Sequence, residues 1–261
     1  MKISEIKADA RLKLKDRWGR AAFIVLGFVI FNLAVSFAGS LPLLSALIVI
    51  GSIVITVPIN YGLEKSFFEF YHGKEVSLFD FVGYGFKNFS KAWSVTWNKF
   101  LALLLPTIIT IISGVVAIFA IFSIFFQAFF GSFSGVTPDV AAAIPLLRIS
   151  MYSFSIYVVS AIITAILSLK YVIARLISID NPELTGKECI DESRNLMSGN
   201  ILKYIFLNLS FIGWAFLSAL TFGIGMFWLA PYMQVSIISF YRMLKPEDKS
   251  VLYQVDDIVN E

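Results

Sequence analysis

LNLSFIGW, residues 207–214, and GIGMFWLAPY, residues 223–232, lie in two apolar runs that extend from Tyr204 to Leu220 and from Ile224 to Arg242. Neither run contains an acidic residue. A helix needs about 20 consecutive apolar residues to cross the hydrocarbon core of a bilayer. Both runs are therefore predicted to be transmembrane helices, joined through Thr221-Phe222-Gly223, and similar runs recur along the chain.

The composition supports this interpretation. Of 261 residues, 58% are apolar and 15% are charged, with a mean hydropathy of +0.80. Soluble domains average roughly half apolar and a quarter charged residues. The net charge of +3 does not indicate nucleic-acid binding, because the basic residues flank apolar runs instead of gathering on one soluble face.

Six transmembrane helices are predicted, at Ala21 to Ala38, Leu43 to Gly62, Phe100 to about Phe125, Ser150 to Tyr171, Tyr204 to Leu220 and Ile224 to Arg242. Seven Lys and Arg residues precede the first run, none lies between the first two, and five lie from Lys65 to Lys99. Because cytoplasmic loops carry the excess of Lys and Arg, both termini are expected in the cytosol. The predicted fold is an all-α polytopic membrane helix bundle in the cell membrane.

One integral membrane domain, residues 1–261, is expected. Its predicted parts are a cytosolic amphipathic helix (1–20), a first helix hairpin (21–62), a cytosolic loop with an interfacial helix (63–99), spans three and four (100–179), a cytosolic helix (180–203), spans five and six (204–242) and a cytosolic tail (243–261). Glycines and prolines between Phe126 and Arg148 favour a loop there.

Three polar segments have the spacing of amphipathic helices. They are Lys2 to Trp18, Phe79 to Trp93, and Thr185 to Met197, the last opening with capping-box spacing between Thr185 and Glu188. Basic side chains beside a membrane attract anionic inner-leaflet lipids, although they can also act as topology signals alone. The candidate surface for lipid or a partner protein comprises Lys13, Lys15, Arg17, Trp18, Lys170, Arg175 and Arg194.

Catalytic and metal chemistry have few candidate residues. His72 is the only histidine and Cys189 the only cysteine, so no catalytic residue, cofactor or metal site is predicted. Asn32 and Asn60 lie within predicted spans, where hydrogen bonds between helices are the usual role of such amides.

The chain resembles a bacterial, mostly Gram-positive, integral-membrane family catalogued as domain of unknown function nine-seventy-five. Residues that carry the resemblance, and the candidate structural hallmark, include Asn181, Pro182, Gly199, Asn200, Gly213, Trp214, Gly225, Pro231 and Tyr232. The resemblance implies a six-helix membrane protein and carries over no catalytic residue, because none is established for the family.

Three functions remain open. The first is a non-catalytic membrane protein that binds lipid, or a partner membrane protein, through its cytosolic amphipathic helices. The second is a small transporter or channel, for which an apolar or lipid-like substrate is required because no predicted span has Asp or Glu in its interior. The third is an interfacial enzyme. The oligomeric state is not predicted.

Overall fold

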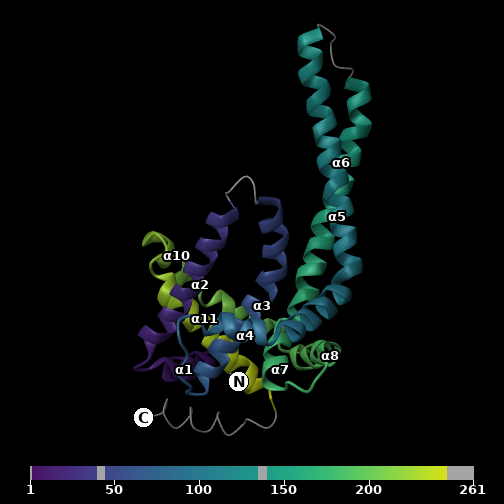
Figure 1. Ribbon diagram of the computed structural model, residues 1–261. Helices are drawn as coiled ribbons and strands as arrows, with labels where there is room; N and C mark the ends of the chain where they lie inside the picture. The colour runs from purple at the N-terminus through teal and green to yellow at the C-terminus, as the bar shows by residue number, and fades with distance from the viewer. Residues whose placement is uncertain (1, 40–44, 135–139, 246–261) are drawn as a thin grey trace. The chain divides into compact units, whose positions relative to one another are not determined.

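A computed structural model describes residues 2–39, 45–134 and 140–245. Over these residues the chain forms α-helices and no strand (Figure 1). The helices are α1 (Ile3–Leu14), α2 (Trp18–Gly39), α3 (Ser45–Tyr71), α4 (Asp80–Lys87), α5 (Phe89–Ser134), α6 (Val140–Leu169), α7 (Ala174–Asp180), α8 (Gly186–Met197), α9 (Ile201–Leu209), α10 (Ile212–Leu220) and α11 (Met226–Leu244). Residues 40–42, between the first two predicted spans, and most of the predicted tail lie outside the described residues.

The chain divides into two compact units, Met1–Asn98 with Lys170–Glu261, and Lys99–Leu169. In the first unit, α2 and α3 rise side by side from a layer that contains α1, α4, α7 and α8 (Figure 1). The C-terminal half of α11 is buried and packs against α1, α2 and α3. The core of this unit therefore lies at the end of the long helices where the amphipathic helices gather.

Helix α1 is amphipathic, as its sequence predicts. Ile6, Ala10 and Leu14 are completely buried, and α1 packs against α11. The apolar face thus contacts protein. The predicted continuation to Trp18 is wrong, because the helix ends at Leu14 and Asp16 takes a φ of 60° before Trp18 begins α2.

Helix α4 packs so closely on α3 that glycine is required on both sides. A Cβ on Gly62 would lie about 1.9 Å from the Phe81 carbonyl oxygen, and one on Gly85 would lie 2.4 Å from the carbonyl oxygen of Pro58. The single helix predicted from Phe79 to Trp93 is instead α4 and the start of α5, separated at Asn88. Phe81 of α4 is completely buried, whereas Phe86 is exposed.

Helix α8 begins with the predicted capping box. The Glu188 amide donates to the Thr185 hydroxyl at 3.3 Å, and the Thr185 amide donates to the Glu188 carboxylate at 2.6 Å. Cys189, Ile190 and other members of the predicted apolar face are buried, and Gly199 has a φ of 78° after the helix ends.

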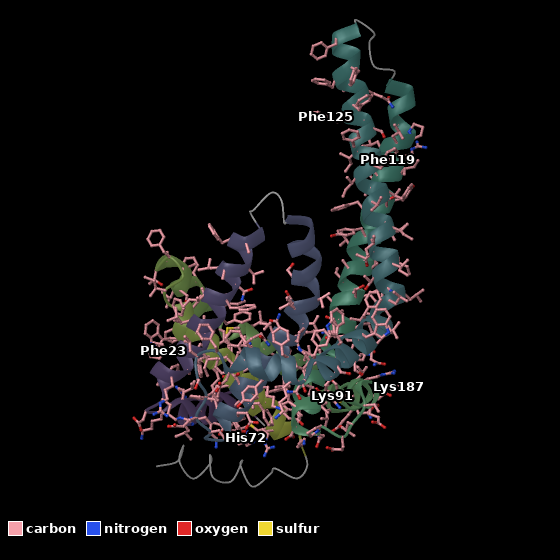
Figure 2. The ribbon with its side chains drawn as sticks, viewed as in Figure 1. Phe23, His72, Lys91, Phe119, Phe125 and Lys187 are labelled. Atoms are coloured by element: carbon pink, nitrogen blue, oxygen red, sulfur yellow. The ribbon has the colours of Figure 1, made fainter. Side chains whose placement is uncertain are left out.

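The second unit is an antiparallel pair made by α6 and the part of α5 after Asn98. The Thr110 and Thr164 hydroxyls lie 3.4 Å apart, and the Tyr157 ring lies against Gly114. Outward-facing aromatic side chains on α5 include Phe119 and Phe125 (Figure 2). Because α6 has 30 residues, it rises about 45 Å, more than the roughly 30 Å hydrocarbon thickness.

The loop predicted from Phe126 to Arg148 is longer than the connection in the structure, because most of this stretch is helical. Helix α5 continues to Ser134 and α6 begins at Val140, which leaves only residues 135–139 between them, outside the described part. Gly131 and Pro145 favour a loop in the sequence, yet both are inside helices. Pro145 is the sixth residue of α6 and lies beyond its first turn, so its missing N–H removes one i→i−4 hydrogen bond without ending the helix.

Four helical segments in the described residues are long and apolar enough to cross a membrane: Trp18–Gly39, Phe89–Phe130, Ile144–Asp180 and Ile201–Leu220. They contain the first, third, fourth and fifth predicted spans. The fifth contains a turn at Ser210–Phe211 that separates α9 from α10. The second and sixth predicted spans correspond to α3 and α11.

Candidate functional site: an aromatic groove beside α1

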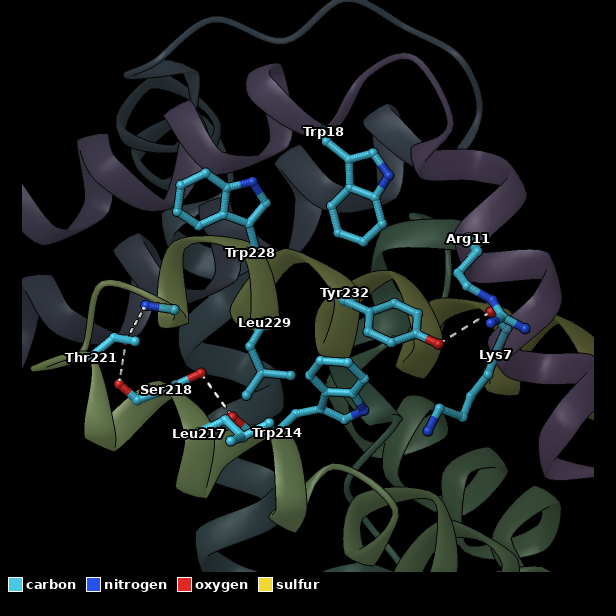
Figure 3. A pocket seen from close by; sticks show the side chains of 11 residues that line it. Lys7, Arg11, Trp18, Trp214, Leu217, Ser218, Thr221, Trp228, Leu229 and Tyr232 are labelled. Carbon is cyan, nitrogen blue, oxygen red and sulfur yellow. Dashed lines mark hydrogen bonds between the residues drawn. The ribbon is translucent and has the colours of Figure 1, made fainter.

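A groove of about 570 Å³ lies within the first unit, where α1 and the start of α2 face α10 and α11. Figure 3 shows the rings of Trp18, Trp214, Trp228 and Tyr232 around it. The other lining residues are Lys7, Arg11, Leu217, Ser218, Thr221, Gly225 and Leu229. Its walls are mainly apolar, with two basic side chains supplied by α1.

The turn between α9 and α10 positions Lys7. The Lys7 ammonium group lies 3.1 Å from the Ser210 hydroxyl and 3.4 Å from the Ser210 carbonyl oxygen, and 4.7 Å from the centre of the Phe211 ring. A cation at the C-terminal end of a helix is stabilised by the helix dipole. Lys7 therefore joins α1 to the end of α9.

The turn between α10 and α11 forms another wall. Thr221 donates its hydroxyl proton to the Ser218 carbonyl at 2.8 Å and accepts from the Gly225 amide at 3.0 Å. A Cβ on Gly225 would lie 2.6 Å from the Ser218 hydroxyl oxygen. Glycine at 225 thus allows α10 and α11 to approach closely enough for Trp214 and Trp228 to line one groove.

Tyr232 connects the groove to α1. Its hydroxyl donates to the Lys7 carbonyl oxygen at 3.4 Å, and its ring centre lies 6.0 Å from that of Trp18 and 5.2 Å from that of Phe211. Trp214 and Trp228 remain 59% and 53% exposed. The Tyr232 end is therefore packed, while the tryptophan side is open.

The two basic residues of the groove lie one helical turn apart. Burial, and secondly the charge of Arg11, lower the pKa of Lys7. No Asp or Glu is among the described residues that line the groove. A negatively charged group at this end would reduce the repulsion between the two cations, and an apolar segment would fit along the aromatic walls. The arrangement suits an amphiphilic anion.

The structure separates the seven residues of the predicted lipid or partner surface. Trp18 lines the aromatic groove, whereas Lys13, Lys15 and Arg17 line a different hollow on the other flank of α1.

The other three lie near α7 and α8. Arg175 forms an ion pair with Glu64 of α3 at 2.6 Å. The Lys170 backbone carbonyl accepts a hydrogen bond from Ser193 of α8 at 2.9 Å, and Arg194 is exposed on α8. These residues do not form one continuous surface with the groove.

The nine hallmark residues also fall into groups. Trp214, Gly225 and Tyr232 line the groove, Pro231 is buried inside α11, and Gly213 is exposed on α10. The region around Pro231 therefore supports a wall of the groove.

The other hallmark residues end helices or join them. The Asn181 amide donates to the Ile177 carbonyl at 2.8 Å, and the Pro182 carbonyl accepts from Lys91 at 3.0 Å. Gly199 supplies the positive φ after α8, and Asn200 donates its side-chain amide to the Leu196 carbonyl at 3.0 Å.

Sequence reasoning missed Lys7, Arg11 and Trp228 as groove residues. One available signal was the spacing of Lys7 and Arg11, which places two cations on the same flank of an amphipathic helix. Nothing in the sequence indicated that this flank would face α10 and α11, because that contact joins residues more than 200 positions apart.

The described elements define an all-helical protein with the composition of a membrane protein and an aromatic groove bordered by cations. The chain belongs to the family described as Protein of unknown function (DUF975), whose model matches residues 1–248. Comparison with curated proteins and with solved structures found no match.

Proposed function

We propose that the chain is a bacterial cell-membrane protein with six spans and cytosolic termini that binds an anionic lipid in the aromatic groove, without catalysing a reaction. The observation that carries this proposal is the position of Lys7 and Arg11 at the end of a mainly apolar groove. The lipid's charged headgroup would lie beside these cations, and part of an acyl chain would lie against Trp214, Leu217 and Trp228.

The size and chemistry of the groove support a lipid. Its volume of about 570 Å³ is within the roughly 300–1,000 Å³ usual for small-molecule sites. Each Lys or Arg near an anionic surface contributes about 1 kcal/mol. Tryptophan is also common at the headgroup level of membranes.

The proposal can be tested with full-length protein in nanodiscs that contain phosphatidylcholine and a variable fraction of phosphatidylglycerol. Native mass spectrometry after release would count retained phosphatidylglycerol. We expect the Lys7→Gln/Arg11→Gln variant to retain at least tenfold less than wild type, because two charges are removed. Lys187→Gln/Lys203→Gln removes two charges from outside the groove and should retain the wild-type amount.

Equal retention by wild type and the Lys7→Gln/Arg11→Gln variant would contradict the proposed site. A second variant, Trp228→Ala, tests the apolar wall independently of charge. Trp228 is 53% exposed, so this change should preserve the fold while it reduces retention of long-chain phosphatidylglycerol more than that of a short-chain analogue.

Movement of a lipid-like substrate is a second candidate, favoured by the open tryptophan side of the groove. A fluorescent phosphatidylglycerol translocation assay in proteoliposomes would distinguish it from simple binding. Catalysis is not proposed, since the residues that line the groove include no acid and base pair.

A further inference from the structure

A second hollow, separate from the aromatic groove, lies on the other flank of α1. It has a volume of about 450 Å³, and its lining combines the end of α1 and the following turn, the end of α3, and α11. The lining residues are Leu12, Lys13, Lys15, Arg17, Tyr71, His72, Gly73 and Arg242. We call it the basic hollow.

Arg17 fixes one wall of the basic hollow. Its guanidinium donates to the Phe70 carbonyl oxygen at 3.2 Å and to the Lys74 carbonyl oxygen at 2.7 Å, and lies 4.2 Å from the centre of the Phe70 ring. A guanidinium has five N–H donors, so these two bonds hold the group in place and leave donors for a ligand.

Tyr71 supports the next part of the wall. Its hydroxyl donates to the buried Asp9 carboxylate at 2.8 Å, and the Lys13 ammonium group lies 5.0 Å from the centre of its ring. His72 is exposed, and its Nδ1 lies 2.7 Å from the Phe68 carbonyl oxygen, which assigns Nδ1 as the donor. These contacts orient the side chains before any ligand binds.

Positive charge dominates the basic hollow. No carboxylate is among its described lining residues. Two nearby carboxylates already have partners: Asp9 accepts from Tyr71, and Asp180 accepts from Tyr241 and Lys245 and lies 3.6 Å from Arg242. Asp16, between Lys15 and Arg17 in the sequence, is exposed and does not line the hollow.

We propose that the basic hollow binds a phosphate group carrying at least two negative charges, as in a phosphate monoester or a pyrophosphate. Lys13 and Lys15 supply exposed ammonium groups, and Arg17 supplies fixed donors in the planar geometry that matches phosphate oxygens. The same chemistry occurs in soluble phosphorylated molecules and in lipid headgroups such as phosphatidic acid. This proposal does not depend on the lipid proposed for the aromatic groove.

The test uses full-length protein in phosphatidylcholine nanodiscs and inorganic pyrophosphate as a soluble probe, followed by isothermal titration calorimetry. Wild type should bind, with an affinity that decreases as salt concentration increases. Lys13→Gln/Lys15→Gln should weaken binding at least tenfold, at about fivefold for each removed charge. Both lysines are exposed, so this variant should fold normally.

Two matched variants separate this site from other causes. Lys187→Gln/Lys203→Gln removes the same charge elsewhere, and Lys7→Gln/Arg11→Gln alters only the aromatic groove. Both should bind pyrophosphate within about twofold of wild type by this argument. The proposed phosphate site is overturned if either control variant weakens pyrophosphate binding as strongly as Lys13→Gln/Lys15→Gln does. It is also overturned if Lys13→Gln/Lys15→Gln binds pyrophosphate like wild type.

A second measurement identifies the source of the phosphate. Retention of phosphatidic acid, which has a phosphate monoester headgroup, is compared with retention of phosphatidylglycerol, which has a phosphate diester, in nanodiscs that contain one lipid or the other. Stronger retention of phosphatidic acid that depends on Lys13 and Lys15 supports a headgroup site, and binding of pyrophosphate alone supports a soluble ligand. Absence of both kinds of binding overturns the proposal.

Discussion

At the residue scale, single glycines decide whether two helices can pack. Gly62 and Gly85 allow contact between the backbones of α3 and α4. Gly83 lies on the same short helix but is exposed, with no atom within 4 Å of a Cβ added there. These positions therefore provide a direct comparison between a glycine that packing requires and one that it does not.

We predict that Gly62→Ala destabilises the protein by more than about 3 kcal/mol, because the added methyl group meets backbone atoms that cannot move alone. Gly83→Ala should instead stabilise it by about 0.5–1 kcal/mol, by raising helix propensity. Thermal unfolding in a mild detergent would measure both. Similar melting temperatures for the two variants would contradict the close packing of α3 and α4.

The capping box of α8 supplies a prediction with a defined pH dependence. Hydrogen bonds from Thr185, first from its backbone amide, hold the pKa of Glu188 below its ordinary value of 4.5. The ionised form is therefore favoured by folding. Its stabilising effect is fully present above pH 4.5 and is lost as the pH falls through the lowered value.

Glu188→Gln should accordingly increase amide hydrogen exchange in α8 at neutral pH, and the difference from wild type should decrease in acid. Thr185→Ala should destabilise α8 by about 1 kcal/mol at either pH, through loss of the cap. Hydrogen exchange followed by mass spectrometry of the 185–197 peptide checks both. A pH-independent difference for Glu188→Gln would exclude the carboxylate as the cause.

At the element scale, the amphipathic helices bury their apolar faces against the protein. Ile6 and Leu14 of α1 and Cys189 and Met197 of α8 are all completely buried. Helix α1 consequently presents two different polar flanks, one to the aromatic groove and one to the basic hollow.

Burial also predicts the reactivity of Cys189. Desolvation raises the pKa of its thiol, which reduces the thiolate that reacts with alkylating reagents. We expect maleimide labelling of native protein to be at least a hundredfold slower than labelling of Lys187→Cys in a Cys189→Ser background, because position 187 is exposed. Comparable rates would show that α8 opens readily from its partners.

At the scale of the whole molecule, membrane topology depends on how far the α10–α11 pair extends. Helix α10 has nine residues and rises only about 14 Å, so it cannot cross the hydrocarbon core without α9. Phe222, between α10 and α11, is completely exposed. Phe222 lies in the connection between the fifth and sixth predicted spans. If all six spans cross the membrane, this connection lies outside the cell.

We predict that Phe222→Cys, in a Cys189→Ser background, reacts with a membrane-impermeant maleimide added to intact cells. Lys187→Cys should react only after the membrane is opened, because α8 is predicted to be cytosolic. Protection of both positions in intact cells would indicate that α10 and α11 enter the membrane partway and return to the same side.

The sequence was sufficient for the class of the fold and for several local features. Long uncharged runs predicted helices, and the spacing of Thr185 and Glu188 predicted the start of α8. These features depend on residues close together in the chain. The family was likewise identified from local motifs, and its model matches residues 1–248.

The sequence predicted the helix boundaries near Asn88 and between Phe126 and Arg148 less well, because tertiary context overrides local propensity. Gly85 illustrates the difference: it weakens an isolated helix, yet it permits the contact between α3 and α4. Asn60 was predicted to form a hydrogen bond between helices. In the structure its side-chain amide donates to the Thr56 carbonyl of its own helix at 2.8 Å.

A helical chain with membrane-like apolar runs and basic amphipathic segments follows from the sequence alone, because periodicity and hydropathy are local properties. Which flank of α1 faces which cavity depends on the tertiary structure. Lys7 and Tyr232 are separated by 225 positions, yet a hydrogen bond joins their backbone and side chain. Such contacts follow from the packing of α1 against α11, which buries the apolar faces of both helices together.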